Sequence, residues 1–188
     1  MSKRRGRAIA YAADRLSTLF QGGPVEIAFR PALTAARGRL LSGELRGNPV
    51  HAATYLRRRR IVLDSALLDD PPELARILGH ELYHFVWIRL GNSARRSWES
   101  VLEAELEARA RGELGWSAEV RKRNLRVEDL PLRTKRWREY VCESFCDSAA
   151  CFLAGVEHPE FTLAPRYRRY RANWFRNRQL LGGKRISI

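Results

Sequence analysis

The sequence is poor in cysteine and has no long apolar run. Its three cysteines, Cys142, Cys146 and Cys151, all lie within ten residues of one expected helix. An odd number of thiols so close together argues against a disulfide framework and favours a reducing compartment. The basic N-terminus is followed by only about seven apolar residues before Asp14, too few for a signal peptide. No stretch approaches the roughly twenty apolar residues of a membrane span, so we expect a cytoplasmic protein without a membrane partner.

Lysine is also scarce. Only 4 of the 35 basic residues are lysine, so arginine carries almost all of the formal net charge of +14. Guanidinium groups pair well with phosphates and carboxylates, which would suit a nucleic-acid or acidic-peptide partner. A GC-rich genome can produce the same bias and leave only a solvated basic surface, and we favour that interpretation. The 188 residues, 45% of them hydrophobic, suit a single domain with a real core.

A metal-binding pattern lies in an amphipathic stretch. His80, Glu81 and His84 follow the order His-Glu-x-x-His, which brings two imidazoles to one helical face one turn apart. Residues 70–73, Asp-Pro-Pro-Glu, provide an N-cap carboxylate, a proline at the first helical position and a glutamate at the third, and Gly91 ends the apolar pattern. The pattern therefore predicts a helix that presents both histidines to one metal ion. Two histidines that share a face by chance are the alternative.

A catalytic zinc needs a third protein ligand and one open position. We choose Glu143, because Asp147 lies four residues later on the same face and could orient a ligating imidazole through a hydrogen bond. Glu103 is a rival, although its neighbours are those of a charged surface helix. Cys146 could instead close a His-His-Cys site. Because Cys142 and Cys146 are rotated by about 100° from Glu143, we expect them to pack in the core.

The rest of the chain predicts further elements from its apolar spacing and its glycine and proline positions. His51 lies outside any pattern, and we expect it to be structural. The run Arg57–Arg60 favours a solvated turn over a phosphate clamp. In chain order the pattern predicts a packing helix over 9–20, strands over 25–30 and 38–46, a strand at the end of 55–64, a helix over 97–111, a loop-rich stretch over 115–131 and a helix over 134–154.

His80-Glu81-Leu82-Tyr83-His84, followed on a later helix by Glu143 and Asp147, resembles the gluzincin class of zinc metallopeptidases, the thermolysin-like arrangement. The resemblance covers roughly a third of the chain and implies that His80, His84 and Glu143 bind zinc (Zn²⁺). It also implies that Glu81 is the general base and that Asp147 supports a histidine ligand. In zincin folds the strand before the metal helix forms the sheet edge that lines the cleft, so the strand within 55–64 is expected there; an internal strand is the alternative. The asparagine that commonly precedes the zinc-binding glutamate is Cys142 here.

The C-terminal stretch 166–178 interleaves aromatic residues with arginine. Such mixtures occur in single-strand nucleic-acid grooves, but we favour an amphipathic helix whose aromatic rings pack inward while its arginines extend into solvent. A zincin also needs a donor for the oxyanion. Tyr167 and Tyr170 are our candidates for this catalytic role, with Arg171 and His158 left open.

These patterns together predict an α+β, zincin-like single domain over residues 1–188. A small twisted sheet, within about 1–92, packs on the helix of His80 and His84, and the second part, about 93–188, is mainly helical. The expected function is zinc-dependent hydrolysis of peptide bonds, as an endopeptidase or aminopeptidase acting on a peptide or protein substrate that can be acidic. The alternative is a non-catalytic, zincin-like nucleic-acid-binding or regulatory protein with structural zinc. We expect any binding of nucleic acid to be weak.

Overall fold

The computed structural model describes residues 3–16, 19–37, 39–43, 47–155, 157–181 and 185–188. Over these ranges the chain is of the α+β class, with six α-helices and small mixed sheets. Its elements in order are α1 (Lys3–Leu16), β1 (Phe20–Gln21), β2 (Glu26–Arg30), β3 (Leu33–Ala36), β4 (Arg39–Ser42), β5 (Asn48–Pro49), β6 (Ala52–Tyr55), the short 3₁₀ helix η1 (Leu56–Arg58), β7 (Arg60–Asp64), η2 (Ser65–Asp69), α2 (Pro71–Arg89), α3 (Asn92–Glu107), α4 (Trp116–Arg123), α5 (Lys135–Ala154), α6 (Pro165–Asn177) and β8 (Ile186–Ser187).

The sheet beside α2 has the order β2-β7-β6. β7 pairs in parallel with β2 and antiparallel with β6. The expectation that the strand within 55–64 forms the sheet edge is therefore wrong, because β7 is the central strand and its residues Ile61 to Leu63 are buried. The edge that faces α2 is β6, which the sequence analysis did not predict. The chain reverses between β6 and β7 through a tight turn in which Arg59 adopts a left-handed conformation at φ 47°.

The arginine run 57–60 lies at this turn, as expected, with its last residue at the start of β7. The Arg59 guanidinium donates hydrogen bonds to the carbonyl oxygens of Gly23 and Pro24. It also lies over the Phe85 ring, 5.4 Å from its centroid. Arg59 thereby ties the turn to the loop before β2 and to α2.

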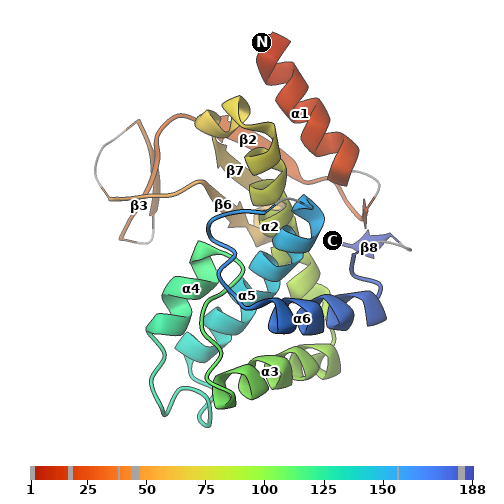
Figure 1. Cartoon of the computed structure of the whole chain (residues 1–188). Helices are drawn as coiled ribbons and strands as arrows, with labels where there is room; N and C mark the ends of the chain where they lie inside the picture. Colours follow the sequence, from red (N-terminus) through yellow and green to blue (C-terminus); the bar gives the residue numbers. More distant parts are fainter. Residues whose placement is uncertain (1–2, 17–18, 38, 44–46, 156, 182–184) are drawn as a thin grey trace.

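The two long helices that carry the expected ligands, α2 and α5, pack against each other in the middle of the molecule (Figure 1). α2 begins as predicted: the side chain of Asp70 accepts a hydrogen bond from the backbone N–H of Glu73 at 3.1 Å. α5 begins after Thr134, whose hydroxyl caps the helix, and ends at Gly155, which has a left-handed conformation at φ 63°. Both predicted helices are confirmed, because their caps and apolar faces are encoded locally.

Several element boundaries differ from the prediction. The first helix ends at Leu16, and Phe20 belongs to β1, which pairs in parallel with the C-terminal strand β8. The strand predicted over 38–46 is the β4 part of an antiparallel pair with β3, and residues 38 and 44–46 of that prediction lie outside the described residues. The helix predicted over 97–111 begins earlier, at Asn92. Within the described ranges, no helix is long and apolar enough to cross a membrane.

The predicted final helix is confirmed as α6, with Trp174 and Phe175 packed into the core. The expectation that its arginines extend into solvent is wrong for Arg171, which is completely buried. Its guanidinium bonds the carboxylates of Glu105 and Glu113, so the charge is satisfied inside the protein. Two carboxylates from α3 and from the loop after it therefore draw one arginine of α6 inward.

Candidate metal centre

His80 and His84 lie side by side on the face of α2 that packs against α5. Their ring centroids are 5.0 Å apart, and the His80 side chain is almost fully enclosed. α5 presents Glu143 and Asp147 to His80, and Cys142 and Cys146 to His84. The four-residue spacing on α2 thus matches a four-residue spacing on α5, and the ligand atoms of the two helices meet between them.

Asp147 fixes the orientation of His80. One carboxylate oxygen, Oδ1, is 2.7 Å from His80 Nδ1, and the other accepts a hydrogen bond from the backbone N–H of Ala118 at 2.8 Å. Burial lowers the pKa of His80, but the Asp147 carboxylate outweighs it and raises this pKa well above the usual value. With Nδ1 engaged, His80 is left with Nε2 as its metal-binding atom, which is the arrangement that supports a ligating imidazole. The predicted pairing of Asp147 with an imidazole is therefore present.

The approach of Asp147 to α4 depends on Gly115, the residue just before that helix. A Cβ atom at position 115 would lie 2.3–2.6 Å from the Asp147 carboxylate atoms, closer than any real contact. Gly115 has no side chain with which to cap α4, and the carboxylate of Asp147 takes this role at the Ala118 N–H. One carboxylate thus connects the start of α4 to a candidate metal ligand.

Glu143 faces the other nitrogen of His80. Its Oε2 atom is 3.3 Å from His80 Nε2, and its Oε1 atom is 3.3 Å from a terminal nitrogen of Arg121 on α4. Burial raises the pKa of Glu143, but the hydrogen bond with His80 and the nearby positive charges lower it to about 2. Glu143 is therefore a carboxylate that is held ionised beside the free nitrogen of His80, as a metal ligand should be.

Cys146 is buried in the core and Cys142 packs against it, as expected, but both thiols also face a histidine. The Sγ atoms of Cys142 and Cys146 are 3.6 and 3.5 Å from His84 Nδ1. The hydrogen bonds with Cys146 and, to a smaller extent, with His84 lower the pKa of Cys142 to about 6 against the effect of burial. The thiols and the carboxylates lie on different faces of α5, as expected. Because the ring centroids of His80 and His84 are 5.0 Å apart, the carboxylates contact His80 while the thiols contact His84.

His80, His84 and Cys146 could together hold a metal ion. One ligand atom from each of these residues lies within 4.8 Å of the others, and no other such group occurs in the part of the chain that the structure describes. The donor set fits a transition metal, since imidazole and thiolate are both preferred ligands of that class. Glu103, the rival third ligand, lies on α3 and is not part of the group. Glu143 is also outside this group, although its Oε2 atom lies 3.3 Å from His80 Nε2. Cys146, within the group, and Glu143, beside His80, therefore both remain candidates for the third ligand.

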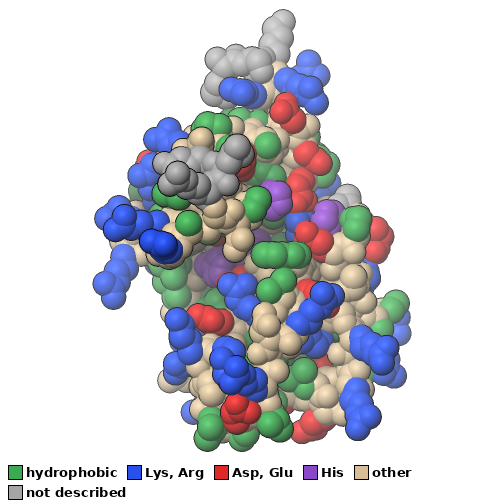
Figure 2. Space-filling model, turned by 90° about the vertical axis from the view of Figure 1, so that its left-hand side faces the viewer, with side chains coloured by type: hydrophobic (Ala, Val, Ile, Leu, Met, Phe, Trp, Pro, Cys, Tyr) green, Lys and Arg blue, Asp and Glu red, His purple; other side chains and the backbone are tan. Residues whose placement is uncertain are grey.

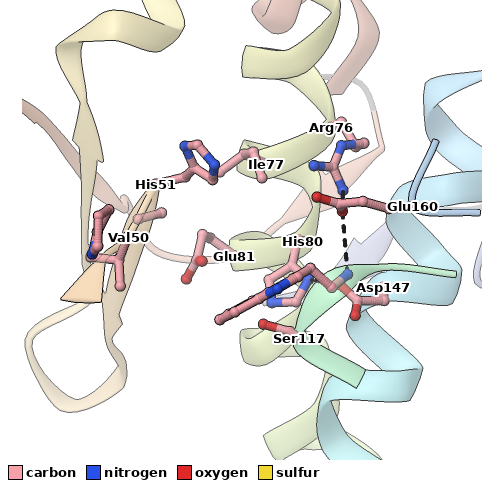
Figure 3. A pocket seen from close by; sticks show the side chains of 12 residues that line it. Val50, His51, Arg76, Ile77, His80, Glu81, Ser117, Asp147 and Glu160 are labelled. Carbon is pink, nitrogen blue, oxygen red and sulfur yellow. Dashed lines mark hydrogen bonds and ion pairs between the residues drawn. The ribbon is translucent and has the colours of Figure 1, made fainter. Parts of the chain in front are cut away.

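Glu81 points from α2 toward the sheet and is held there by the edge strand (Figure 3). The hydroxyl of Thr54 on β6 donates a hydrogen bond to Glu81 Oε2 at 2.5 Å. Glu81 is largely buried, with 8% of its surface exposed, and what remains exposed faces a pocket. The sequence analysis missed Thr54, because nothing in a single sequence says which residue of a short strand lies opposite a helix.

The pocket beside Glu81 and His80 has a volume of about 260 Å³. One wall is the segment 49–52 with His51, the opposite wall is the start of α4, and Asp147, Arg76 and Glu160 also line it (Figure 3). His51, expected to be structural, is therefore a pocket residue. On the surface, the histidines gather near the middle of one face beside acidic side chains, with Lys and Arg spread around them (Figure 2).

The candidates for the oxyanion donor lie elsewhere. Tyr170 is 60% exposed on α6, and Tyr167 packs against a small apolar cluster that contains Phe161. Arg171 is buried in its ion pairs, and His158 lies 3.7 Å from Glu73 Oε2. None of these four side chains lines the pocket. The structure therefore does not bring Tyr167 and Tyr170 to His80 and Glu81.

The helix α4 contributes Trp116, the backbone N–H of Ala118 and Arg121 to the site. None of these could be predicted, because α4 lies in the stretch expected to be loop-rich. A signal was present: Glu119 lies in the first turn of α4 and Arg121-Lys122-Arg123 in its last, the charge order that complements a helix dipole. The length of 8 residues made the apolar period too short to recognise.

The sequence matches no protein-family model, and comparisons with curated proteins and with solved structures gave no significant match. The chemistry of the site therefore rests on its own residues.

Proposed function

We propose that the protein is a zinc-dependent peptidase of the zincin type. The observation that carries the proposal is the connection of His80 to Asp147 through Nδ1 and to Glu143 through Nε2, with Glu81 next in sequence and facing a pocket. Metal-assisted hydrolysis needs one carboxylate that orients a ligating imidazole, a second that is ionised and can bind the metal, and a third that faces open space. A purely structural site has no use for Glu81.

The metal would be held by His80, His84 and a third residue, for which Glu143 is our choice. Zinc supplies Lewis-acid chemistry there, since it makes a water more acidic and polarises a carbonyl group. Both histidines carry a raised pKa without the metal, so binding would release protons, and affinity should fall as the pH is lowered. Glu143 is preferred over Cys146 as the third ligand. Two imidazoles and one carboxylate form the ligand set of known hydrolytic zinc sites, whereas a thiolate with two imidazoles is also common in purely structural sites.

Glu81 acts as general base. It accepts a proton from the attacking water as the new C–O bond forms, and delivers it to the leaving amine as the C–N bond breaks. The Thr54 hydroxyl keeps its carboxylate on the pocket side. The oxyanion needs a donor within the pocket. His51 lines the pocket and has an N–H that can donate, whereas Tyr167 and Tyr170 do not line it.

The edge strand β6 suggests how a substrate binds. β6 pairs with β7 on one side and, among the described strands, has no partner on the other. An extended peptide can add to such an edge through backbone hydrogen bonds, and β6 carries Thr54, the residue that holds Glu81.

The three thiols are all free, which fits a protein that works in the reducing cytoplasm.

Metal analysis of alanine variants tests the proposal and its third ligand. The purified wild type should contain about one zinc per chain, and Glu143→Ala should lose the metal together with peptidase activity. Glu103→Ala should keep both. Loss of zinc in Cys146→Ala with retention in Glu143→Ala would make Cys146 the third ligand. A wild type that binds no divalent metal would overturn the proposal.

A second candidate function, binding of nucleic acid, is favoured by one groove. Four arginines and a single acidic residue line a hollow of about 270 Å³ between α2, α3 and α5: Arg95, Arg96, Arg133, Arg138 and Glu99. If this groove binds phosphates, log affinity should fall by about 0.7 to 0.9 per contact with log salt. We expect such binding to vanish by about 0.2 M salt while peptide cleavage persists. Tight binding at that salt without cleavage of any peptide would favour this second function.

A further inference from the structure

The pocket extends beyond His80 toward the N-terminal end of α2. Arg76 lies one turn before His80, about 6 Å along the helix axis. Glu160, from the loop between α5 and α6, completes that end of the pocket (Figure 3). A substrate group that reaches this end would be attached within about two residues of the bond at His80 and Glu81, because an extended residue spans at most about 3.3–3.6 Å.

The positive charge of Arg76 is already matched. Its Nε and one terminal nitrogen donate to the two carboxylate oxygens of Glu73 at 2.7 and 2.5 Å, and only 5% of its side chain is exposed. The remaining terminal nitrogen is 3.1 Å from Glu160 Oε2. Such a two-pronged pair between guanidinium and carboxylate is strong and rigid, so Arg76 is a support and is not available to bind an anion.

Glu160 is held in place from two sides. Besides Arg76, the backbone N–H of Trp116 donates to its Oε2 atom at 3.2 Å. In the described ranges, no hydrogen bond or ion pair reaches its Oε1 atom. Arg76 serves both Glu73 and Glu160, and His158 Nε2 lies 3.7 Å from Glu73 Oε2, so this end of the pocket carries one negative charge when His158 is neutral. This is notable in a chain with a formal charge of +14.

The rest of the pocket lining also favours a cation. The charged groups that line the pocket are three carboxylates, those of Glu81, Asp147 and Glu160, and one guanidinium. The pocket also contains the imidazoles of His51 and His80, and the second of these is paired with Asp147. Trp116 lies at the rim with 60% of its surface exposed, although it is a large aromatic residue. An aromatic face next to a fixed carboxylate is a favourable environment for a cation with an alkyl stem.

We propose that this end of the pocket is a subsite for a cationic group of the substrate, with Glu160 as its acceptor and Trp116 as the surface along which its stem packs. The proposal rests on the proposed peptidase function and names its substrate class: peptides with a positive charge next to the cleaved bond. The charge can come from a lysine or arginine side chain or from the free N-terminal amine, since both offer N–H donors to a carboxylate.

Cleavage of matched peptides tests the subsite. One peptide series carries Lys, Arg, Leu or Glu at each position that flanks the cleaved bond, and each peptide is made with a free and with an acetylated N-terminus. The wild type should prefer Lys and Arg, or a free amine, by about tenfold or more in kcat/KM, as expected for a hydrogen bond to a charged group. A preference that survives acetylation assigns the charge to the side chain, and one that disappears assigns it to the N-terminal amine.

The variants separate recognition from folding. Glu160→Gln keeps a group that can accept from Arg76 and Trp116, so it should retain zinc and thermal stability yet lose the preference for cationic over neutral peptides. Trp116→Ala should reduce the preference several-fold. Glu157→Gln is the control, because Glu157 lies on the same loop, is exposed and, within the described ranges, has its ion pair with Arg168. Equal cleavage of all peptides by the wild type, or an equal loss on all peptides in Glu160→Gln, would overturn the subsite.

A binding measurement keeps the two proposals distinguishable. If no peptide is cleaved, the peptidase function fails, and the subsite is then tested with three probes: Nα-acetyl-lysinamide, norleucinamide and Nα-acetyl-norleucinamide, which carry a side-chain cation, an N-terminal cation and no cation. Tighter binding of either cationic probe than of the neutral one, lost in Glu160→Gln and kept in Glu157→Gln, would support the subsite by itself. Equal affinity for all three probes would contradict it.

Discussion

At the scale of single residues, Asp147 serves two partners with one carboxylate. One oxygen orients the His80 imidazole and the other caps α4 through the Ala118 N–H. A carboxylate that accepts two hydrogen bonds has little freedom to turn, so it also fixes the orientation of the His80 ring. The protein's own contacts therefore fix one of the two imidazoles of the proposed metal site.

Asp147→Asn should lower zinc affinity by about ten- to a hundredfold, because an amide can satisfy only one of the two N–H donors as an acceptor and presents its own N–H to the other. Competition with a chelator of known affinity measures the change. An unchanged affinity would mean that Asp147 serves only to cap α4.

Thr54→Val should reduce kcat/KM by about tenfold or more while zinc content stays constant, because the Glu81 carboxylate loses the hydrogen bond that holds it beside the pocket. Thr54→Ser keeps the hydroxyl and is the matched control. Steady-state kinetics on one peptide compares the three proteins. Equal activity in the valine variant would remove Thr54 from the positioning of the base.

The residues that could be predicted at this scale are those whose partners are fixed by helical spacing. His80, Glu81, His84, Glu143 and Asp147 were found because three- and four-residue intervals determine which side chains share a face. Thr54, His51 and Arg121 could not be found in that way. Each reaches the site from a strand, loop or short helix whose placement depends on tertiary packing.

At the scale of elements, the site depends on close approach between α4 and α5. Gly115 lets the backbone before α4 come within contact of the Asp147 side chain, a position that no larger residue could occupy. The long helices α2 and α5 were predictable from caps and apolar stripes. The order of the sheet was not, because the apolar run in β7 fits a central strand and an edge strand equally well.

Gly115→Ala should weaken zinc binding and lower the free energy of unfolding by about 1–3 kcal/mol, since the added Cβ forces the Asp147 carboxylate away. Gly91→Ala is a matched control: Gly91 also precedes a helix, and nothing lies within 4 Å of an added Cβ there. Chemical denaturation and zinc competition report the two effects. Similar behaviour of both variants would contradict the close-packing argument.

At the scale of the whole molecule, a strongly basic chain keeps part of its acidic complement inside. Glu113 is fully buried with Arg171, Lys122 and Tyr140 as partners. Burial raises the pKa of Glu113, but the Arg171 guanidinium outweighs it and lowers this pKa to about 2 from the ordinary 4.5. Because the folded state favours the ionised form, this stabilisation is fully present above about pH 4.5 and is lost as the pH falls toward 2.

Glu113→Gln should therefore destabilise the protein near neutral pH, on the order of 3 kcal/mol, since Arg171 loses one of its two buried counter-charges. The difference from wild type should shrink as the pH is lowered from about 4.5 to 2. Glu139→Gln, which removes an exposed helical pair with Lys135, should leave the profile almost unchanged. Unfolding free energies across this pH range test the prediction, and a difference independent of pH would contradict it.

The proposed peptidase function depends on Glu81 as the base of a hydrolytic zinc site. The most direct test compares wild type with Glu81→Gln, both loaded with one zinc per chain, on a peptide library. The variant keeps every proposed ligand and an acceptor for Thr54, so it should bind zinc as the wild type does and lose peptide cleavage by about a hundredfold or more. Cleavage at the wild-type rate by zinc-loaded Glu81→Gln would contradict the account.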